Sequence, residues 1–123
     1  MYKFTLLAAA GIILSSCGNA QNTGSGATRN LSPVSFQSTM DTTKNGLLVD
    51  VRTPEEFESG HLKGAINIDF RGNDFKTQIQ KLDKHAPIFV YCHSGNRSGK
   101  ATEMMRELGF TNVSNLTGGI SGW

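Results

Sequence analysis

The chain has 123 residues, of which 37% are hydrophobic and 18% charged. At roughly 100–200 residues per domain, this length allows one small domain and excludes a two-domain enzyme. Twelve basic and ten acidic side chains are interspersed and leave a net charge of +2, so nothing in the charge pattern suggests nucleic-acid binding. Two Cys and three His, at spacings unlike those of metal ligands, favour neither a disulfide framework nor a structural metal.

The first 16 residues are typical of a signal peptide. Lys3 precedes an apolar run over residues 4–14, which is shorter than the about 18 residues needed to span a bilayer. The four residues LSSC, which end at Cys17, resemble the lipobox of bacterial lipoproteins, in which the Cys becomes the lipidated first residue. We therefore expect export and a lipid anchor on Cys17, at a membrane facing the periplasm or at the cell surface. Gly18 favours the outer membrane in a host with two membranes; the alternative is a plain signal peptide with an incidental Cys.

Residues 17–32 are rich in Gly, Asn, Ser and Thr, which is typical of a flexible tether. The folded domain is therefore expected over residues 33–123. In that range short apolar runs alternate with apolar residues at helical spacing, which predicts an α/β domain with a central, mainly parallel sheet flanked by helices. A first edge strand is expected to begin at Val34, with Phe36 and Met40 on a short helix after it.

Local signals mark the remaining elements. Thr53 followed by Glu56 predicts a capping box that starts a short helix, and Gly60 is expected to stop it. A second helix is expected from about Asn73, and a third over 99–108 with Gly109 just beyond its end. Four further strands are expected at residues 47–51, 65–68, 88–91 and 113–116.

Cys92 is the residue with the clearest chemical potential. It falls at the carboxyl end of the expected strand over 88–91, and a short polar segment leads from it directly into a helix. Ligands bind at such strand ends in open α/β sheets. Loop N–H groups, the helix N-terminus and the charge of Arg97 all favour a thiolate, so we expect the pKa of Cys92 below the value of about 8.5 of free cysteine. A buried structural thiol is the alternative.

Three segments in this order resemble the rhodanese (sulfurtransferase) domain family: LLVDVRTPEEFESGHLKGAINID, VYCHSGNRS and LTGGISGW. The resemblance implies an α/β domain with a central parallel sheet. It also implies a Cys, matched by Cys92, that accepts a sulfane sulfur as a persulfide and passes it to a thiophilic acceptor, without metal, nucleotide or organic cofactor. The expected donor-binding residues follow that Cys: His93, Ser94, Gly95, Asn96, Arg97 and Ser98.

Three more residues match the family by position. Asp50 and Arg52 match an Asp-x-Arg segment and are expected to brace the Cys92 loop through charge-assisted hydrogen bonds, with a solvated strand-end pair as the alternative. His61 matches a Gly-His-x-x-Gly-Ala segment, where a structural hydrogen bond is favoured over proton transfer. His93, next to the nucleophile, is expected either to orient an acceptor or to line the rim of the site.

Loop length separates two chemistries. The six residues of Cys92 to Arg97 are one fewer than in the Cys-x5-Arg loop of phosphatase relatives, which suits a single sulfur atom better than a phosphate. We therefore expect transfer of a sulfane sulfur from thiosulfate, or a similar donor, to cyanide or a thiol, with Arg97 and the loop N–H groups holding the sulfonate. The alternatives are a module that carries sulfur for a partner protein without turnover, and an enzyme similar to phosphatases or arsenate reductases. Relatives usually continue past the LTGGISGW segment into a closing helix, so we expect either a minimal domain or an unusually short C-terminus here.

Overall fold

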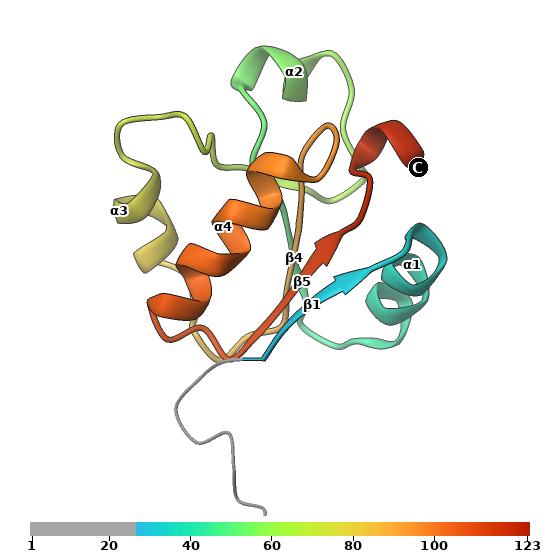
Figure 1. Cartoon of the computed structure of the whole chain (residues 1–123), viewed down its shortest axis with the longest axis horizontal. Coiled ribbons are helices and arrows are strands. Elements are labelled where there is room, and N and C mark those ends of the chain that lie inside the picture. Colours follow the sequence, from blue (N-terminus) through green and yellow to red (C-terminus); the bar gives the residue numbers. More distant parts are fainter. Residues whose placement is uncertain (1–26) are drawn as a thin grey trace, which may run out of the picture.

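The structure, a computed structural model, describes residues 27–123 (Figure 1). Its five strands form one sheet in the order β1-β5-β4-β2-β3, and every neighbouring pair is parallel. The expected α/β fold with a central parallel sheet is therefore confirmed. The strands are β1 (Ala27–Leu31), β2 (Leu47–Asp50), β3 (Ile66–Asn67), β4 (Ile88–Tyr91) and β5 (Asn112–Leu116).

Helices cover both faces of the sheet and one of its ends. Figure 1 shows α3 and α4 on one side of the sheet, α1 on the other, and α2 above the carboxyl ends of the strands. A short 3-10 turn, η1, ends the described chain, and Trp123 after it packs edge to face against Phe36 of α1. The bounds are α1 (Pro33–Thr42), α2 (Pro54–Glu58), α3 (Phe75–Gln80), α4 (Asn96–Glu107) and η1 (Ile120–Gly122).

The central strand β4 supplies side chains to a hydrophobic core on each side of the sheet. Phe89 packs toward α1, where its ring meets that of Phe36 edge to face with 5.4 Å between the centroids. Val90 and Cys92 point the other way, into the core that contains Met105 of α4. A strand buried on both faces explains why its sequence is a continuous apolar run. The alternation places the thiol of Cys92 on the α4 side.

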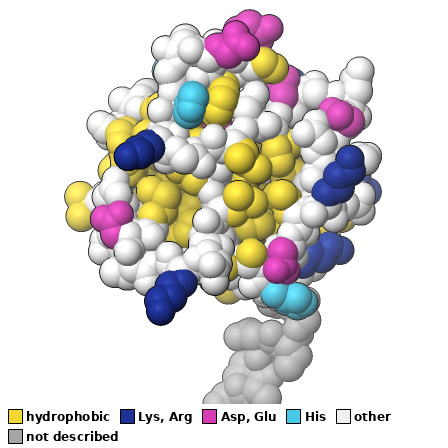
Figure 2. Space-filling view, turned by 180° about the vertical axis from the view of Figure 1, so that it is seen from behind, with side chains coloured by type: hydrophobic (Ala, Val, Ile, Leu, Met, Phe, Trp, Pro, Cys, Tyr) yellow, Lys and Arg dark blue, Asp and Glu magenta, His cyan; other side chains and the backbone are white. Residues whose placement is uncertain are grey.

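Two exposed hydrophobic side chains lie on or beside α1. Seen from behind, hydrophobic side chains gather in the middle of the surface, with charged side chains around them (Figure 2). Val34 is 80% exposed and Trp123 is 45% exposed, and both line a groove along α1. This groove lies on the side of the sheet away from the thiol of Cys92.

Several local expectations are confirmed. The capping box of α2 forms in both directions: Thr53 Oγ1 accepts from the backbone N–H of Glu56, and Glu56 Oε1 accepts from the backbone N–H of Thr53, each at 3.3 Å. β4 covers the residues expected for it. Gly109 follows the end of α4 with a φ of +95°, a backbone conformation that favours glycine after a helix.

The expected tether is wrong for its last residues, because 27–31 form β1 rather than a flexible segment. β1 is a polar edge strand beside β5, so it lacks the apolar pattern by which strands are recognised. Side chains add to its pairing with β5: Arg29 Nη2 donates to Asn112 Oδ1 at 2.9 Å, and Asn115 Nδ2 donates to Asn30 Oδ1 at 3.0 Å. The sheet therefore begins before residue 33.

The strand expected at Val34 is also wrong, since Val34 lies in the first turn of α1. Ser32 caps this helix, with its hydroxyl accepting from the backbone N–H of Ser35, and Pro33 takes the first helical position. Both are ordinary helix-start signals. The expected helix carrying Phe36 and Met40 is present.

Residues 1–26, which contain the expected signal peptide, Cys17 and the rest of the tether, lie outside the described residues. Within 27–123, none of the helices is long and apolar enough to cross a membrane.

Candidate active site

Cys92 comes directly after β4, and the chain turns sharply behind it into α4. The turn depends on Gly95, the residue before α4, which has a φ of +100°. The sequence predicted a loop over residues 92–97, but α4 already begins at Asn96, so the loop ends at Gly95. Arg97 and Ser98 are therefore fixed by the first turn of a twelve-residue helix rather than by a loop.

The thiol of Cys92 is buried, with 1% of the residue exposed, and is surrounded by hydrogen-bond donors. Its Sγ accepts from the backbone N–H of Gly95 at 3.1 Å and from the hydroxyl of Ser98 at 3.3 Å. Burial raises the pKa of Cys92, but the hydroxyl and N–H of Ser98 and the N–H groups of Gly95 and Ser94 together outweigh it. The pKa of Cys92 is therefore lower than usual, as the sequence led us to expect, and a thiolate is favoured.

Arg97 forms an ion pair that the sequence did not predict. Its guanidinium forms a bidentate ion pair with Glu56 of α2, with Nη1 to Oε1 at 2.7 Å and Nη2 to Oε2 at 3.1 Å. The expected full positive charge beside the thiolate is thus largely balanced by a carboxylate 41 residues away in sequence. The donors that hold the sulfur come from Gly95 and Ser98 instead.

Glu56 is a site residue that the sequence interpretation recognised only as part of a helix cap. Hydrogen bonds from Arg97 lower the pKa of Glu56 to about 2, against the opposing effect of burial and with help from Thr53. The carboxylate is therefore ionised at neutral pH. Because α2 lies above the carboxyl ends of the strands (Figure 1), this ion pair joins α2 to the helix that follows Cys92.

The segment after β5 forms a second support for the Cys92 loop. Ile120 N donates to the carbonyl of Cys92 at 2.9 Å, and Ser121 N donates to the carbonyl of His93 at 3.0 Å. Gly119 lies against the same two carbonyls, with no room for a side chain. The LTGGISGW segment was the signal for this contact, although the sequence alone did not show that it reaches Cys92.

The Asp50–Arg52 pair is buried and braces a different loop from the one expected. Asp50 is fully buried and Arg52 is 5% exposed, so the alternative of a solvated pair is wrong. Arg52 Nη2 donates to Asp50 Oδ2 and to the carbonyl of Gly60, each at 2.7 Å. Asn67 Nδ2 donates to the backbone carbonyls of Asp50 and Arg52. The pair therefore ties the end of β2 to the segment between α2 and β3.

The two histidines lie at the surface of the site region. The ring of His61 stacks on Phe57 at 3.7 Å between centroids, and its Nδ1 lies 2.9 Å from the carbonyl of Phe57, which fits a structural role. The side chain of His93 is exposed, and Ser94 and Asn96 are exposed as well. No three His, Cys, Asp or Glu side chains gather to hold a metal ion within the part of the chain that the structure describes.

The hydroxyl of Ser98 gives a pH-dependent prediction. Ser98→Ala removes a donor that favours the thiolate, so the pKa of Cys92 should rise, and alkylation by iodoacetamide should reach half its maximal rate at higher pH. Alkylation rates from pH 4 to 10 would measure this shift. Ser114→Ala is the matched control, because Ser114 is equally buried but its hydroxyl has no hydrogen-bond partner among residues 27–123. Equal profiles for both variants would contradict the role of Ser98.

Comparison with known proteins agrees with this geometry. The chain belongs to the rhodanese-like domain family, whose profile matches residues 32–123. It is 39% identical over 70 residues to thiosulfate sulfurtransferase PspE of Escherichia coli, which covers 57% of this chain and 67% of PspE. A rhodanese-related protein from Thermoplasma volcanium has a similar structure, with a TM-score of 0.67 and 28% identity over 77% of this chain and 89% of that one.

One relative with a longer chain limits how much can be carried over. The uncharacterized protein YqhL of Bacillus subtilis is 40% identical over 76 residues, which cover 62% of this chain but only 59% of YqhL. Family membership and the similarity to PspE support sulfurtransferase activity in general. Donor, acceptor and mechanism are matters for proposal.

Proposed function

We propose that the protein is a sulfurtransferase that moves a sulfane sulfur from thiosulfate, or a similar donor, to cyanide or a thiol through a persulfide on Cys92. The observation that carries this proposal is the donor arrangement around Sγ, where a hydroxyl and a backbone N–H converge on a buried thiol. The same donors that favour a thiolate would also favour the anionic persulfide that replaces it.

The proposed first step balances without any oxidant. The Cys92 thiolate attacks the outer sulfur of thiosulfate, a new sulfur–sulfur bond forms, and the bond within thiosulfate breaks with its electron pair leaving on sulfite. The loop N–H groups and the N-terminus of α4 stabilise the departing charge. In the second step cyanide or a thiol attacks the outer sulfur of the persulfide and restores the thiolate. Cys92 is the free cysteine of residues 27–123, so no second thiol there can resolve the persulfide.

Sulfur loading and turnover test the proposal together. We expect the protein to gain the mass of one sulfur atom after thiosulfate alone, and to form thiocyanate when cyanide is added. Cys92→Ser should lose both, since a hydroxyl at this position cannot form a persulfide. Intact mass spectrometry and a thiocyanate assay measure the two steps separately.

The outcomes distinguish the alternative functions. Loading without turnover would favour a sulfur carrier that needs a partner protein. The absence of any adduct would contradict transfer from thiosulfate and reopen the phosphatase and arsenate reductase alternatives.

We also propose that the protein is exported and anchored to a membrane by lipid on Cys17, with its domain facing the periplasm or the cell surface. The support is the apolar run over residues 4–14 followed by LSSC. Metabolic labelling with an alkyne fatty acid should mark the protein, and Cys17→Ala should lose the label and leave the membrane fraction. A labelled Cys17→Ala variant would contradict the anchor.

A further inference from the structure

The ion pair between Arg97 and Glu56 changes the charge that an incoming sulfur donor meets. A guanidinium has five N–H donors, and Arg97 directs two of them to the Glu56 carboxylate. The remaining donors can still contact a ligand, but the two side chains together carry no net charge. An anion near Arg97 would thus meet hydrogen-bond donors without a net attractive charge.

Glu56 is held firmly and is not free to swing away. Its Oε1 accepts from Thr53 N at 3.3 Å, from Thr53 Oγ1 at 3.1 Å and from Arg97, while Oε2 accepts the second bond from Arg97. The Thr53 contacts belong to the capping box that starts α2. Moving the carboxylate to release Arg97 would therefore also disrupt the start of this helix. A sulfur donor that binds near Arg97 therefore binds with the Glu56 carboxylate in its present position.

The other charges acting on Arg97 are also negative. The hydrogen bond to Glu56 raises the pKa of Arg97 most, burial opposes it, and the negative charges of Glu56, of the Cys92 thiolate and of Asp69 raise it further. A dianion such as thiosulfate that approaches Arg97 would therefore also meet the negative charges of Glu56, Asp69 and the Cys92 thiolate. Repulsion grows in proportion to the charge of the donor, so a monoanion or a neutral persulfide is less affected.

We propose that Glu56 is a specificity-determining residue, which by neutralising Arg97 makes the Cys92 site accept sulfane-sulfur donors with at most one negative charge more readily than dianionic thiosulfate. This inference rests on the proposed sulfurtransferase function. Thiosulfate remains a substrate, but one that Glu56 disfavours.

A pair of donors that differ by one charge provides the test. Methanethiosulfonate resembles thiosulfate but replaces one anionic oxygen with a methyl group. The Cys92 thiolate attacks its terminal sulfur, the sulfur–sulfur bond of the donor breaks, and methanesulfinate leaves with the electron pair. The rate of sulfur loading is measured by intact mass at several donor concentrations, without an acceptor. Its dependence on concentration separates the apparent affinity for the donor from the limiting rate of sulfur transfer to Cys92.

Glu56→Gln is the informative variant, because Gln can also complete a capping box but carries no charge. Since Coulomb energy is linear in donor charge, we expect apparent affinity to rise about tenfold for thiosulfate and about threefold for methanethiosulfonate, with limiting rates changing less. The gain should shrink at high salt. Glu56→Asp, which keeps the charge, should leave the preference between the donors near that of the wild type.

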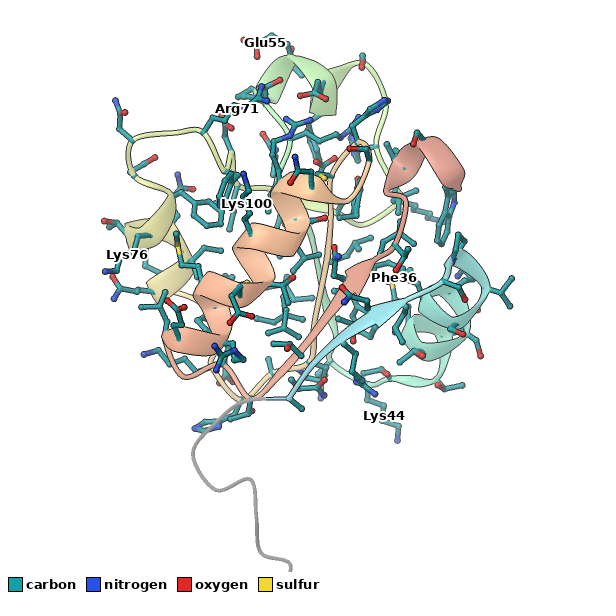
Figure 3. All side chains as sticks on the ribbon, in the orientation of Figure 1. Phe36, Lys44, Glu55, Arg71, Lys76 and Lys100 are labelled. Atoms are coloured by element: carbon teal, nitrogen blue, oxygen red, sulfur yellow. The ribbon has the colours of Figure 1, made fainter. Side chains whose placement is uncertain are left out.

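Glu55→Gln is the matched control for removing one negative charge from the same helix turn. Figure 3 shows Glu55 on the outer side of α2, pointing into solvent, and the side chain is exposed. We expect this variant to change the preference between the donors by less than about twofold, because an exposed charge is screened.

Two results would overturn the inference. The first is that Glu56→Gln shows the same preference between thiosulfate and methanethiosulfonate as the wild type. The second is weaker loading from thiosulfate in Glu56→Gln, which would show that Glu56 positions Arg97 to bind the dianion. Failure of the proposed function gives a different result, since the wild type would then gain no sulfur from either donor.

Discussion

Gly119→Ala is expected to destabilise the domain by roughly 2–6 kcal/mol and to disrupt the Cys92 loop. A Cβ at this position would lie 2.3 Å from the carbonyl oxygen of His93 and 2.6 Å from that of Cys92. The neighbours are backbone atoms, which cannot move aside as a flexible side chain can. In addition, φ of +63° with ψ of −165° is a conformation that essentially only glycine adopts. Thermal unfolding and the iodoacetamide rate at Cys92 would measure both effects.

Two neighbouring glycines separate the causes. Gly118 has a φ of +80° and an open space around it, so Gly118→Ala introduces backbone strain without a steric clash. Gly122→Ala introduces neither, because no atom lies within 4 Å of its Cβ and its φ is not in the left-handed region. We expect the loss of stability to increase in the order Gly122, Gly118, Gly119. A Gly119→Ala variant as stable as Gly122→Ala would contradict the close approach to Cys92.

Asp50→Asn is expected to lower stability by about 3–5 kcal/mol, because it leaves the charge of Arg52 buried without a counter-charge. The change keeps the size of the side chain, so lost packing contributes little. For a domain of this size the melting temperature should fall by roughly 12 °C or more. The guanidinium also lies 5.7 Å from the ring centroid of Tyr91, and this contact remains in the variant.

An exposed ion pair serves as the control for this change. Glu103 and Arg106 form a salt bridge one turn apart on α4, and their side chains are 54% and 36% exposed. Glu103→Gln removes a charge of the same sign from this pair, and solvent compensates the partner, so the melting temperature should hardly change. Similar losses in Asp50→Asn and Glu103→Gln would mean that burial of the Asp50–Arg52 pair contributes nothing to stability.

The elements that the sequence predicted well are those with strong local signals. The cap of α2 needs only Thr53 and Glu56, three residues apart, and the end of α4 needs only Gly109. β4 is a continuous apolar run because helices cover both faces of the sheet. In each case the determining interaction lies within one turn or one strand, where sequence patterns are informative.

The missed features depend on contacts between distant segments. β1 is polar and half-exposed, and it is a strand only because β5 lies beside it. The partner of Arg97 was missed for a related reason, since Glu56 already had a sufficient local role as the third residue of α2. Asp50 and Arg52 were recognised as a pair, but the loop they hold depends on the path of the backbone near Gly60. Sequence spacing does not contain that information.

The pairing of β1 with β5 determines when the domain can finish folding. Residue 27 is aligned with residue 112, so the first described strand can pair only after the chain has been synthesised past residue 112. The backbone carbonyls of Cys92 and His93 likewise gain their hydrogen bonds only after Ile120 and Ser121 have been synthesised. Because such long-range contacts form late, a chain emerging from its N-terminus cannot complete the environment of Cys92 early. The hydrogen-bonded surroundings of Cys92 therefore form only when segments from both ends of residues 27–123 have come together.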